Sequence, residues 1–165
     1  MIKLTIKKLT KENFSHFGDV IETKNSNYFM INNGSTKRYH KLSQVDLSDN
    51  DDKTIISIFR ASKLSFPLQI KMLEKHPKGS QAFIPLKQNP FLIIVAPKNN
   101  QPDPNLIEAF ITDGTQGVNY FKNTWHHPII TIENEDDFLV IDRDGEGKNC
   151  DEYFFSENIQ ILLNH

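Results

Sequence analysis

The segment MLEKHPKGSQ, residues 72–81, has the pattern of a strand end, a turn and a new strand. Side chains two apart on a strand share a face, so Met72, Glu74 and His76 point the same way, apolar first and polar last. After the Pro–Gly turn, Gln81 can return on that side. Such a face runs from a packed core to a polar mouth, and its donor groups suit a divalent metal or a polar substrate.

Outward from this stretch the chain is a series of short strand-like runs. Residues 2–7 alternate apolar and polar side chains, which is typical of a half-buried strand. The other runs are 28–31, 54–60, 66–74, 81–86, 91–95, 107–112, 129–132, 138–141 and 159–163, and turn residues such as Asn32-Asn33-Gly34, Asp113-Gly114 and Asp144-Gly145-Glu146-Gly147 separate them. Many short strands at this spacing predict an all-β sandwich or barrel.

One short helix is expected near the start of the chain. Thr10 can cap its beginning, Leu9 and Phe14 are placed for a hydrophobic staple, and Gly18 can end it. No repeat, linker or low-complexity tract indicates a second domain, so we expect residues 1–165 to form one domain.

Composition and charge exclude several classes of protein. Hydrophobic residues make up 38% of the 165 and charged residues 24%, which is an ordinary globular balance. The formal charge of −2 gives no reason to expect nucleic acid or an anionic membrane as a partner. The dense apolar run 91–97 is too short to span a bilayer. The single cysteine, Cys150, suits a reducing compartment, so we expect a soluble cytoplasmic protein.

A second polar cluster is WHHP, residues 125–128, at the entrance of an apolar strand. Adjacent residues on a strand face opposite sides, so only one of His126 and His127 can face the interior. The alternation downstream does not decide which, because Ile129, Ile130 and Ile132 are all apolar. A solvated imidazole at a strand entrance is the competing interpretation of this pair.

The two clusters resemble the two motifs of the cupin superfamily. In the first motif, Glu74 stands in the place of the first histidine, His76 in that of the second, and Gln81 in that of the carboxylate. His126 fits the histidine of the second motif. The resemblance therefore implies a double-stranded β-helix, or jelly roll, with Glu74, His76, Gln81 and His126 as metal ligands.

A more specific resemblance, to the ureidoglycolate lyase family, runs along nearly the whole chain. It is carried by residues 17–22, 31–34, 38–40, 56–61, 74–85, 109–112, 116–120, 125–128, 137–143 and 149–151. It implies a cytoplasmic homodimer that splits (S)-ureidoglycolate into glyoxylate and urea in allantoin catabolism, a part of purine metabolism. A divalent metal ion, nickel in some descriptions, is associated with the family. One carboxylate among four ligands predicts modest affinity, so the purified protein can arrive without the ion.

The reaction implied by the resemblance indicates which residues to consider. Ureidoglycolate carries a hydroxyl, a ureido nitrogen and a carboxylate on one carbon, so its cleavage needs a base, an acid and a cation, but no covalent nucleophile. The candidate proton carriers are His76, His126 and Tyr120. A guanidinium can hold the carboxylate, and the candidates are Arg60 and Arg38, with Arg143 weaker. Asn32, Asn33 and Gln81 are candidates for binding the ureido group. The sequence does not decide whether His40 faces the site or a dimer contact.

Two other functions remain open from the sequence. One is a cupin of another class, such as a sugar isomerase, a hydrolase of another substrate or a dioxygenase, although a dioxygenase favours a fuller histidine site than Glu74 and Gln81 provide. The other is a non-catalytic small-molecule sensor, which would bind ureidoglycolate or glyoxylate without releasing urea.

Overall fold

The computed structural model describes residues 1–165, and the chain is almost entirely β-structure with one short helix. The helix is α1 (Lys11–Phe14), and two 3-10 turns are η1 (Asn32–Gly34) and η2 (Pro104–Leu106). The strands are β1 (Ile2–Leu4), β2 (Ile6–Lys8), β3 (Gly18–Ile21), β4 (Phe29–Ile31), β5 (Thr36–Arg38), β6 (Lys53–Ser62), β7 (Leu68–Gln69), β8 (Met72–Lys75), β9 (Gln81–Pro85), β10 (Phe91–Ala96), β11 (Glu108–Ile111), β12 (Gly117–Tyr120), β13 (Trp125–His126), β14 (Ile130–Thr131), β15 (Glu135–Asp144), β16 (Asp151–Phe154) and β17 (Ile161–Leu163).

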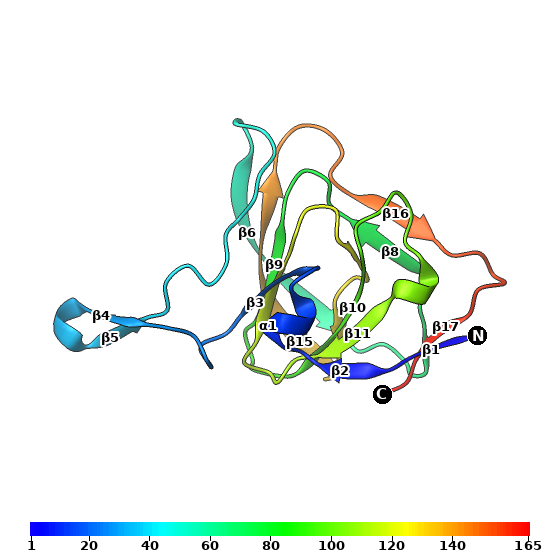
Figure 1. Ribbon diagram of the computed structural model, residues 1–165, viewed down its shortest axis with the longest axis horizontal. Helices are drawn as coiled ribbons and strands as arrows, with labels where there is room; N and C mark the ends of the chain where they lie inside the picture. Colours follow the sequence, from blue (N-terminus) through cyan, green and yellow to red (C-terminus); the bar gives the residue numbers. More distant parts are fainter.

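Two large sheets face one another and enclose the main core (Figure 1). One has the strand order β3-β12-β9-β15-β6, and the other has the order β16-β8-β13-β10-β11-β2, with β14 also paired to β10. Their facing side chains form a cluster rich in phenylalanine, which includes Phe83, Phe91, Phe110 and Phe138. This all-β arrangement, with no closed barrel, confirms the predicted fold class and agrees with a cupin jelly roll.

Strand β10 explains why one run of the sequence is apolar without alternation. Phe91, Ile93 and Val95 face the main core, whereas Leu92 and Ile94 face a second core. The small sheet β1-β17-β7 contributes to this second core, through residues of β17 and residues beside β7. A strand that is buried on both faces needs apolar side chains at every position.

The helix confirms its predicted start but not its predicted end. The Thr10 side chain accepts a hydrogen bond from the backbone N–H of Asn13, and Leu9 and Phe14 lie in the same buried cluster. The prediction that Gly18 ends the helix is wrong, because α1 ends at Phe14 and Gly18 begins β3. Gly18 serves a close approach between strands, since a Cβ there would collide with the Asn119 carbonyl.

Strands β4 and β5 form a hairpin that lies apart from the two sheets. We call residues 24–41 the arm; Figure 1 shows it projecting from the side of the sandwich. Its tip, Asn32-Asn33-Gly34, is left-handed at all three residues, with φ of 51°, 55° and 83°. Asparagine and glycine tolerate this region best, so the turn chemistry explains these residue types.

Most predicted runs are strands in the structure, but their lengths differ. The run 66–74 divides into β7 and β8, while β6 and β15 are each ten residues long and exceed the predicted runs. Strands β3, β5, β12 and β16 were not predicted, because each has only four residues or fewer and no clear alternation. No helix is long and apolar enough to cross a membrane.

Candidate functional site

Strands β8 and β13 place Glu74 and His126 side by side. The two strands pair antiparallel with Glu74 directly opposite His126, so both side chains project from the same face. The Glu74 Oε1 and His126 Nε2 atoms are 3.6 Å apart. His126 is only 2% exposed and its neighbour on the strand, Trp125, packs into the second core. Strand alternation thus sends His126 and not His127 to this cluster.

The His126 ring is held on two sides. Its Nδ1 lies 3.0 Å from the Thr124 carbonyl, which can only accept, so Nδ1 carries the proton. Tyr120 stacks on the ring with centroids 4.3 Å apart and an interplanar angle of 8°. These contacts leave Nε2 as a buried nitrogen without a hydrogen-bond partner, facing Glu74.

His76 joins the cluster through a chain of polar contacts. Its Nδ1 lies 2.7 Å from the Asn149 carbonyl and therefore donates to it, while its Nε2 lies 3.0 Å from Gln81 Oε1. The Gln81 amide donates to Asp142 Oδ2 at 3.1 Å, which fixes its oxygen toward His76. The rings of His76 and His126 are 5.1 Å apart. Both histidines therefore donate from Nδ1 to a backbone carbonyl, and this leaves the Nε2 atoms directed into the cluster.

These residues fit a divalent metal ion. The ligand atoms of Glu74, His76 and His126 lie within 4.8 Å of one another. A backbone carbonyl on the far nitrogen of a histidine is the usual outer contact of a metal ligand. The unpartnered Nε2 of His126 and the facing acceptors of His76 and Gln81 would all be satisfied by one cation. Two imidazoles and a carboxylate suit a first-row ion with open positions better than structural zinc.

Burial and charge set the protonation of the cluster. Burial acts to raise the pKa of Glu74, but His126 and His76 outweigh it, so the pKa of this carboxyl lies below its usual value. Burial, and then the neighbouring His126, lower the pKa of His76. Burial, and then Glu74, raise the pKa of Tyr120. At neutral pH the cluster therefore presents an ionised carboxylate, a neutral His76 and a protonated phenol.

Two of the predicted arginines are engaged elsewhere. Arg60 lies in β6 and donates to both oxygens of Asp137, at 2.8 and 3.1 Å, with an exposed side chain. Arg143 is buried against Asp52 and donates to the Glu146 carbonyl. Neither guanidinium contacts Glu74, His76, Gln81 or His126, so within one chain the structure does not bring the predicted carboxylate anchors to the cluster.

The remaining predicted residues lie in the arm. Asn32 and Asn33 form its tip, and Arg38 pairs with Phe29 in the hairpin with its guanidinium 6.0 Å from that ring. The ring of His40 also packs on Phe29, with centroids 5.8 Å apart. These side chains form local contacts within the arm and none with the cluster.

A cavity beside the cluster shares His76 and Gln81 with it and is otherwise lined by residues that were not predicted from the sequence. This cavity, of about 330 Å³, is lined by His76, Ser80, Gln81, Asp142, Lys148, Asn149 and Cys150. Lys148 has only a long ion pair, 3.9 Å, with Asp151. Burial, and then Glu74, raise the pKa of Cys150 to about 11, so its thiol is a poor nucleophile at neutral pH. The register of β9 and β15, which the sequence does not reveal, brings Asp142 beside Gln81.

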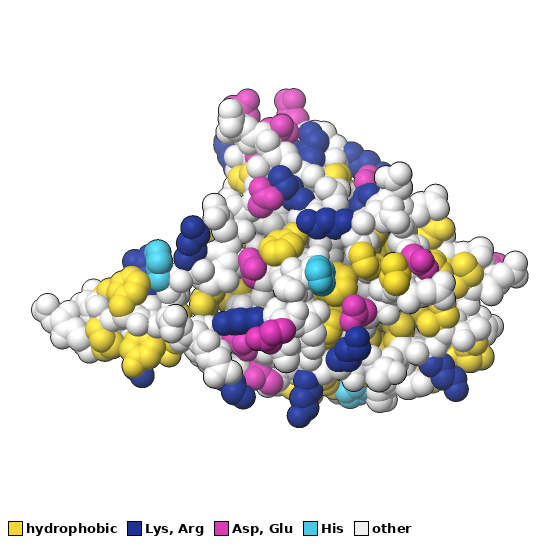
Figure 2. Space-filling view, in the orientation of Figure 1, with side chains coloured by type: hydrophobic (Ala, Val, Ile, Leu, Met, Phe, Trp, Pro, Cys, Tyr) yellow, Lys and Arg dark blue, Asp and Glu magenta, His cyan; other side chains and the backbone are white.

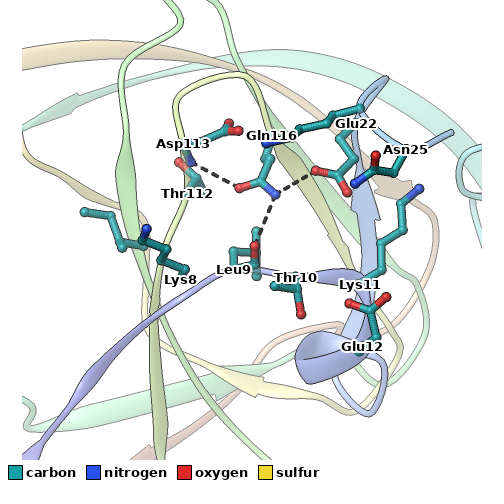
Figure 3. A pocket seen from close by; sticks show the side chains of 12 residues that line it. Lys8, Leu9, Thr10, Lys11, Glu12, Glu22, Asn25, Thr112, Asp113 and Gln116 are labelled. Atoms are coloured by element: carbon teal, nitrogen blue, oxygen red, sulfur yellow. Dashed lines mark hydrogen bonds between the residues drawn. The ribbon is translucent and has the colours of Figure 1, made fainter.

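A second cavity lies on the outside of the sandwich, between α1 and the loop after β11 (Figure 3). Its volume is about 490 Å³, and Gln116 crosses it with hydrogen bonds to Leu9, Glu22 and Asp113. The amide is fully satisfied by these three partners. Since no predicted site residue lines this cavity, the cluster of Glu74, His76 and His126 is the better candidate for chemistry.

Comparisons with known proteins show which family the chain is similar to. The family model of ureidoglycolate lyase matches residues 1–162. A ureidoglycolate lyase of Pseudomonas paraeruginosa is 62% identical over 163 residues, which cover 99% of this chain and 96% of that protein. A ureidoglycolate lyase of Pseudomonas syringae pv. tomato is 60% identical with the same coverage. A solved 3,4-ketoisomerase from Thermoanaerobacterium thermosaccharolyticum is a distant match, 13% identical with a TM-score of 0.43, over 79% of this chain and 83% of that chain.

Proposed function

The chain belongs to the ureidoglycolate lyase family, and we propose that it cleaves (S)-ureidoglycolate to glyoxylate and urea at the cluster of Glu74, His76 and His126. The observation that carries this proposal is the identity of 62% over 99% of the chain with a curated ureidoglycolate lyase. We place this activity in the breakdown of allantoin and propose that the protein acts in the cytoplasm as a homodimer.

The cleavage breaks one bond and moves one proton. The hydroxyl of the hemiaminal carbon loses its proton, a carbonyl forms, and the bond to the ureido nitrogen breaks as that nitrogen gains a proton. Glyoxylate and urea together contain every atom of the substrate, so no water is consumed. A cavity without an activated serine or cysteine suits this elimination.

The residues of the cluster would promote removal of the proton from the substrate hydroxyl. Glu74, His76, His126 and Gln81 would hold a divalent metal, which would act as a Lewis acid and lower the pKa of the substrate hydroxyl. Without such an ion, the Nε2 of His126, which is buried without a hydrogen-bond partner and faces Glu74, is the candidate proton acceptor. One imidazole nitrogen cannot bind a metal and carry a proton together, so the effect of metal removal decides between these two roles.

Tyr120 and Gln81 position other groups. The stacked ring of Tyr120 fixes the plane of His126 and thereby the direction of Nε2. Gln81 is held between His76 and Asp142, where its amide can hydrogen-bond to the ureido group. The stacking on His126 accounts for Tyr120 as a positioning residue, and the predicted role of its hydroxyl as a proton carrier is the competing interpretation that a Tyr120→Phe variant tests.

The test is to follow the products of purified protein with ureidoglycolate. We expect urea and glyoxylate in equal amounts with little ammonia. Enzymes used to detect the products are added only after the reaction has been stopped, so that they do not consume the products during it. Ammonia in place of urea would show that the ureido group is hydrolysed. Binding of ureidoglycolate without turnover would instead identify a sensor.

A further inference from the structure

We propose that the arm of one chain docks on strand β6 of a second copy and brings Arg38 to the mouth of the partner's cavity. The inference rests on the proposed function only in assigning the anion that Arg38 binds, the carboxylate of the substrate. It explains two features together: an arm without a surface to pack on, and a cavity whose candidate guanidiniums are engaged elsewhere.

The arm exposes apolar side chains that its own chain leaves uncovered. Tyr28 is 49% exposed, and Phe29 and Met30 are each 48% exposed. Figure 2 shows hydrophobic side chains gathered on the arm, with basic and histidine side chains beside them. A two-stranded hairpin on its own is marginally stable in water, so a hairpin with such a surface requires a third element to pack against.

Strand β6 offers a complementary surface. It is an edge strand that pairs only with β15, and it is ten residues long. Ile56 and Ile58 are 71% and 64% exposed, and Ile55 and Phe59 are each 39% exposed. A long, apolar and unpaired edge is a site of association unless another chain covers it.

The charges of the two surfaces are of opposite sign. Residues 23–45 contain no aspartate or glutamate but contain Lys24, Lys37, Arg38 and Lys41. At the end of β6 that begins with Lys53, one cavity is lined by five acidic residues and two lysines, so acidic side chains are in excess there; they are Asp49, Asp51, Asp52, Asp144 and Glu146, with Lys53 and Lys78. A basic arm on this acidic end gains electrostatic attraction as well as apolar burial.

The same end of β6 borders the mouth of the site. Ile55 lies directly opposite Asp142 in the pairing of β6 with β15, and Asp142 accepts the hydrogen bond of Gln81. The guanidinium of Arg38, brought to this place, has the planar fork that binds a substrate carboxylate through two parallel hydrogen bonds.

The second copy is favoured over another partner because each chain carries both surfaces. Two copies related by a two-fold axis, the commonest symmetry of homo-oligomers, would exchange arms, each arm covering the β6 of the other chain. Each cavity would then be completed by the arm of its neighbour.

The decisive experiment combines two defective chains. Glu74→Gln chains and Arg38→Ala chains are co-expressed with different tags, and the mixed dimer is purified through both tags. If arms are exchanged, one of the two sites contains an intact cluster and an intact arm, so we expect urea release at about half the wild-type rate per dimer. Both homodimers should be at least about tenfold slower than wild type, since one charge-assisted hydrogen bond is worth 1.5–3 kcal/mol.

The outcome of this mixing separates the alternatives. A mixed dimer no more active than its parents would overturn the proposal, as would full activity of the Arg38→Ala homodimer. Failure of wild-type protein to release urea would contradict the proposed function instead. In that case the exchange of arms is tested by calorimetry of glyoxylate binding to the Glu74→Gln homodimer, the Arg38→Ala homodimer and the mixed dimer. The mixed dimer should bind glyoxylate more tightly than either homodimer.

Oligomeric state provides an independent readout. Met30→Asp and Ile58→Asp should each convert a dimer into a monomer in sedimentation experiments, since each puts a carboxylate into the proposed interface. The matched control is Leu106→Asp, whose side chain is 53% exposed in η2 and outside both surfaces. A wild-type monomer, or dimers that persist in both interface variants, would contradict the proposal.

Discussion

The cluster around His126 and the arm around Arg38 both carry candidate site residues, but these residues are held in different ways. Glu74 and His126 lie on paired strands, with Tyr120 stacked on the imidazole and the Thr124 carbonyl on its Nδ1. Arg38 lies in a hairpin whose contacts are with itself. A rigid sheet holds reacting groups to a fraction of an ångström, whereas an isolated hairpin positions nothing until it is docked. Folding of one chain is therefore enough to organise the cluster, whereas the proposed docking on a second copy would organise the arm.

Metal removal should have the largest effect on the cluster. If the ion is reduced below about a tenth per chain, we expect urea release to fall at least about a thousandfold, because Lewis-acid stabilisation is worth several kcal/mol and each 1.4 kcal/mol is tenfold. Activity should return with nickel or manganese. Elemental analysis beside the assay is the check. Undiminished turnover would assign His76 and His126 to direct proton transfer.

Glu74→Gln should rank next, with a loss of roughly a hundredfold in kcat/KM. Even residues that only orient metal ligands contribute 10- to 100-fold, and this change removes the one carboxylate of the cluster. The matched control is His127→Ala, because His127 donates to the Pro128 carbonyl and lies outside the cluster. Equal losses in the two variants would remove the distinction between His126 and His127.

Arg38→Ala should lower kcat/KM by about tenfold to a hundredfold, in line with one charge-assisted hydrogen bond of 1.5–3 kcal/mol. Arg38→Lys should recover only part of this, since an ammonium lacks the planar fork. The control is Lys37→Ala, whose ammonium lies 4.7 Å from the Tyr28 ring on the other side of the hairpin. Steady-state kinetics together with thermal melting separate this loss of activity from unfolding. Similar losses in Arg38→Ala and Lys37→Ala would indicate a general effect of the positive charge of the arm.

Tyr120→Phe should change kcat by less than about threefold, because the variant keeps the ring that stacks on His126. Tyr120→Ala removes that ring from the main core and should cost roughly 3–5 kcal/mol of folding free energy. Urea denaturation measures the second effect and single-turnover kinetics the first. A hundredfold loss in Tyr120→Phe would establish the hydroxyl as the proton donor.

Lys148→Ala should have the smallest effect, within about twofold, because an exposed lysine with a long ion pair contributes little. Lys148 nevertheless lines the cavity and is the alternative cation for the substrate carboxylate. Kinetics of Lys148→Ala and Arg38→Ala in the same buffer compare the two directly. A tenfold increase in KM for Lys148→Ala, with no increase for Arg38→Ala, would show that Lys148 of the sandwich and not Arg38 of the arm binds the substrate carboxylate.

Patterns with a two-residue period made the interior of the site predictable. Alternation along residues 72–76 placed Glu74 and His76 on one face, and the cupin register selected His126 over His127. Continuous apolar runs such as β10 were equally clear, because burial on both faces leaves an unmistakable pattern.

Contacts that depend on strand register were not predictable. Asp142 reaches Gln81 only because β15 pairs with β9 in one particular register, and residues 148–150 reach His76 through a loop. The arm posed a different difficulty. Tyr28–Ile31 has the pattern of a strand, but its sequence does not say that the strand pairs only within a hairpin and leaves Tyr28, Phe29 and Met30 about half exposed.

The most direct test of a site shared between two chains is a crystal structure with the product glyoxylate bound. We predict glyoxylate between Gln81 and the Nε2 atoms of His76 and His126, with its carboxylate held by an arginine from the arm of a second copy. Glyoxylate at the cluster without any contribution from a second arm, or glyoxylate in the Gln116 cavity, would contradict this account.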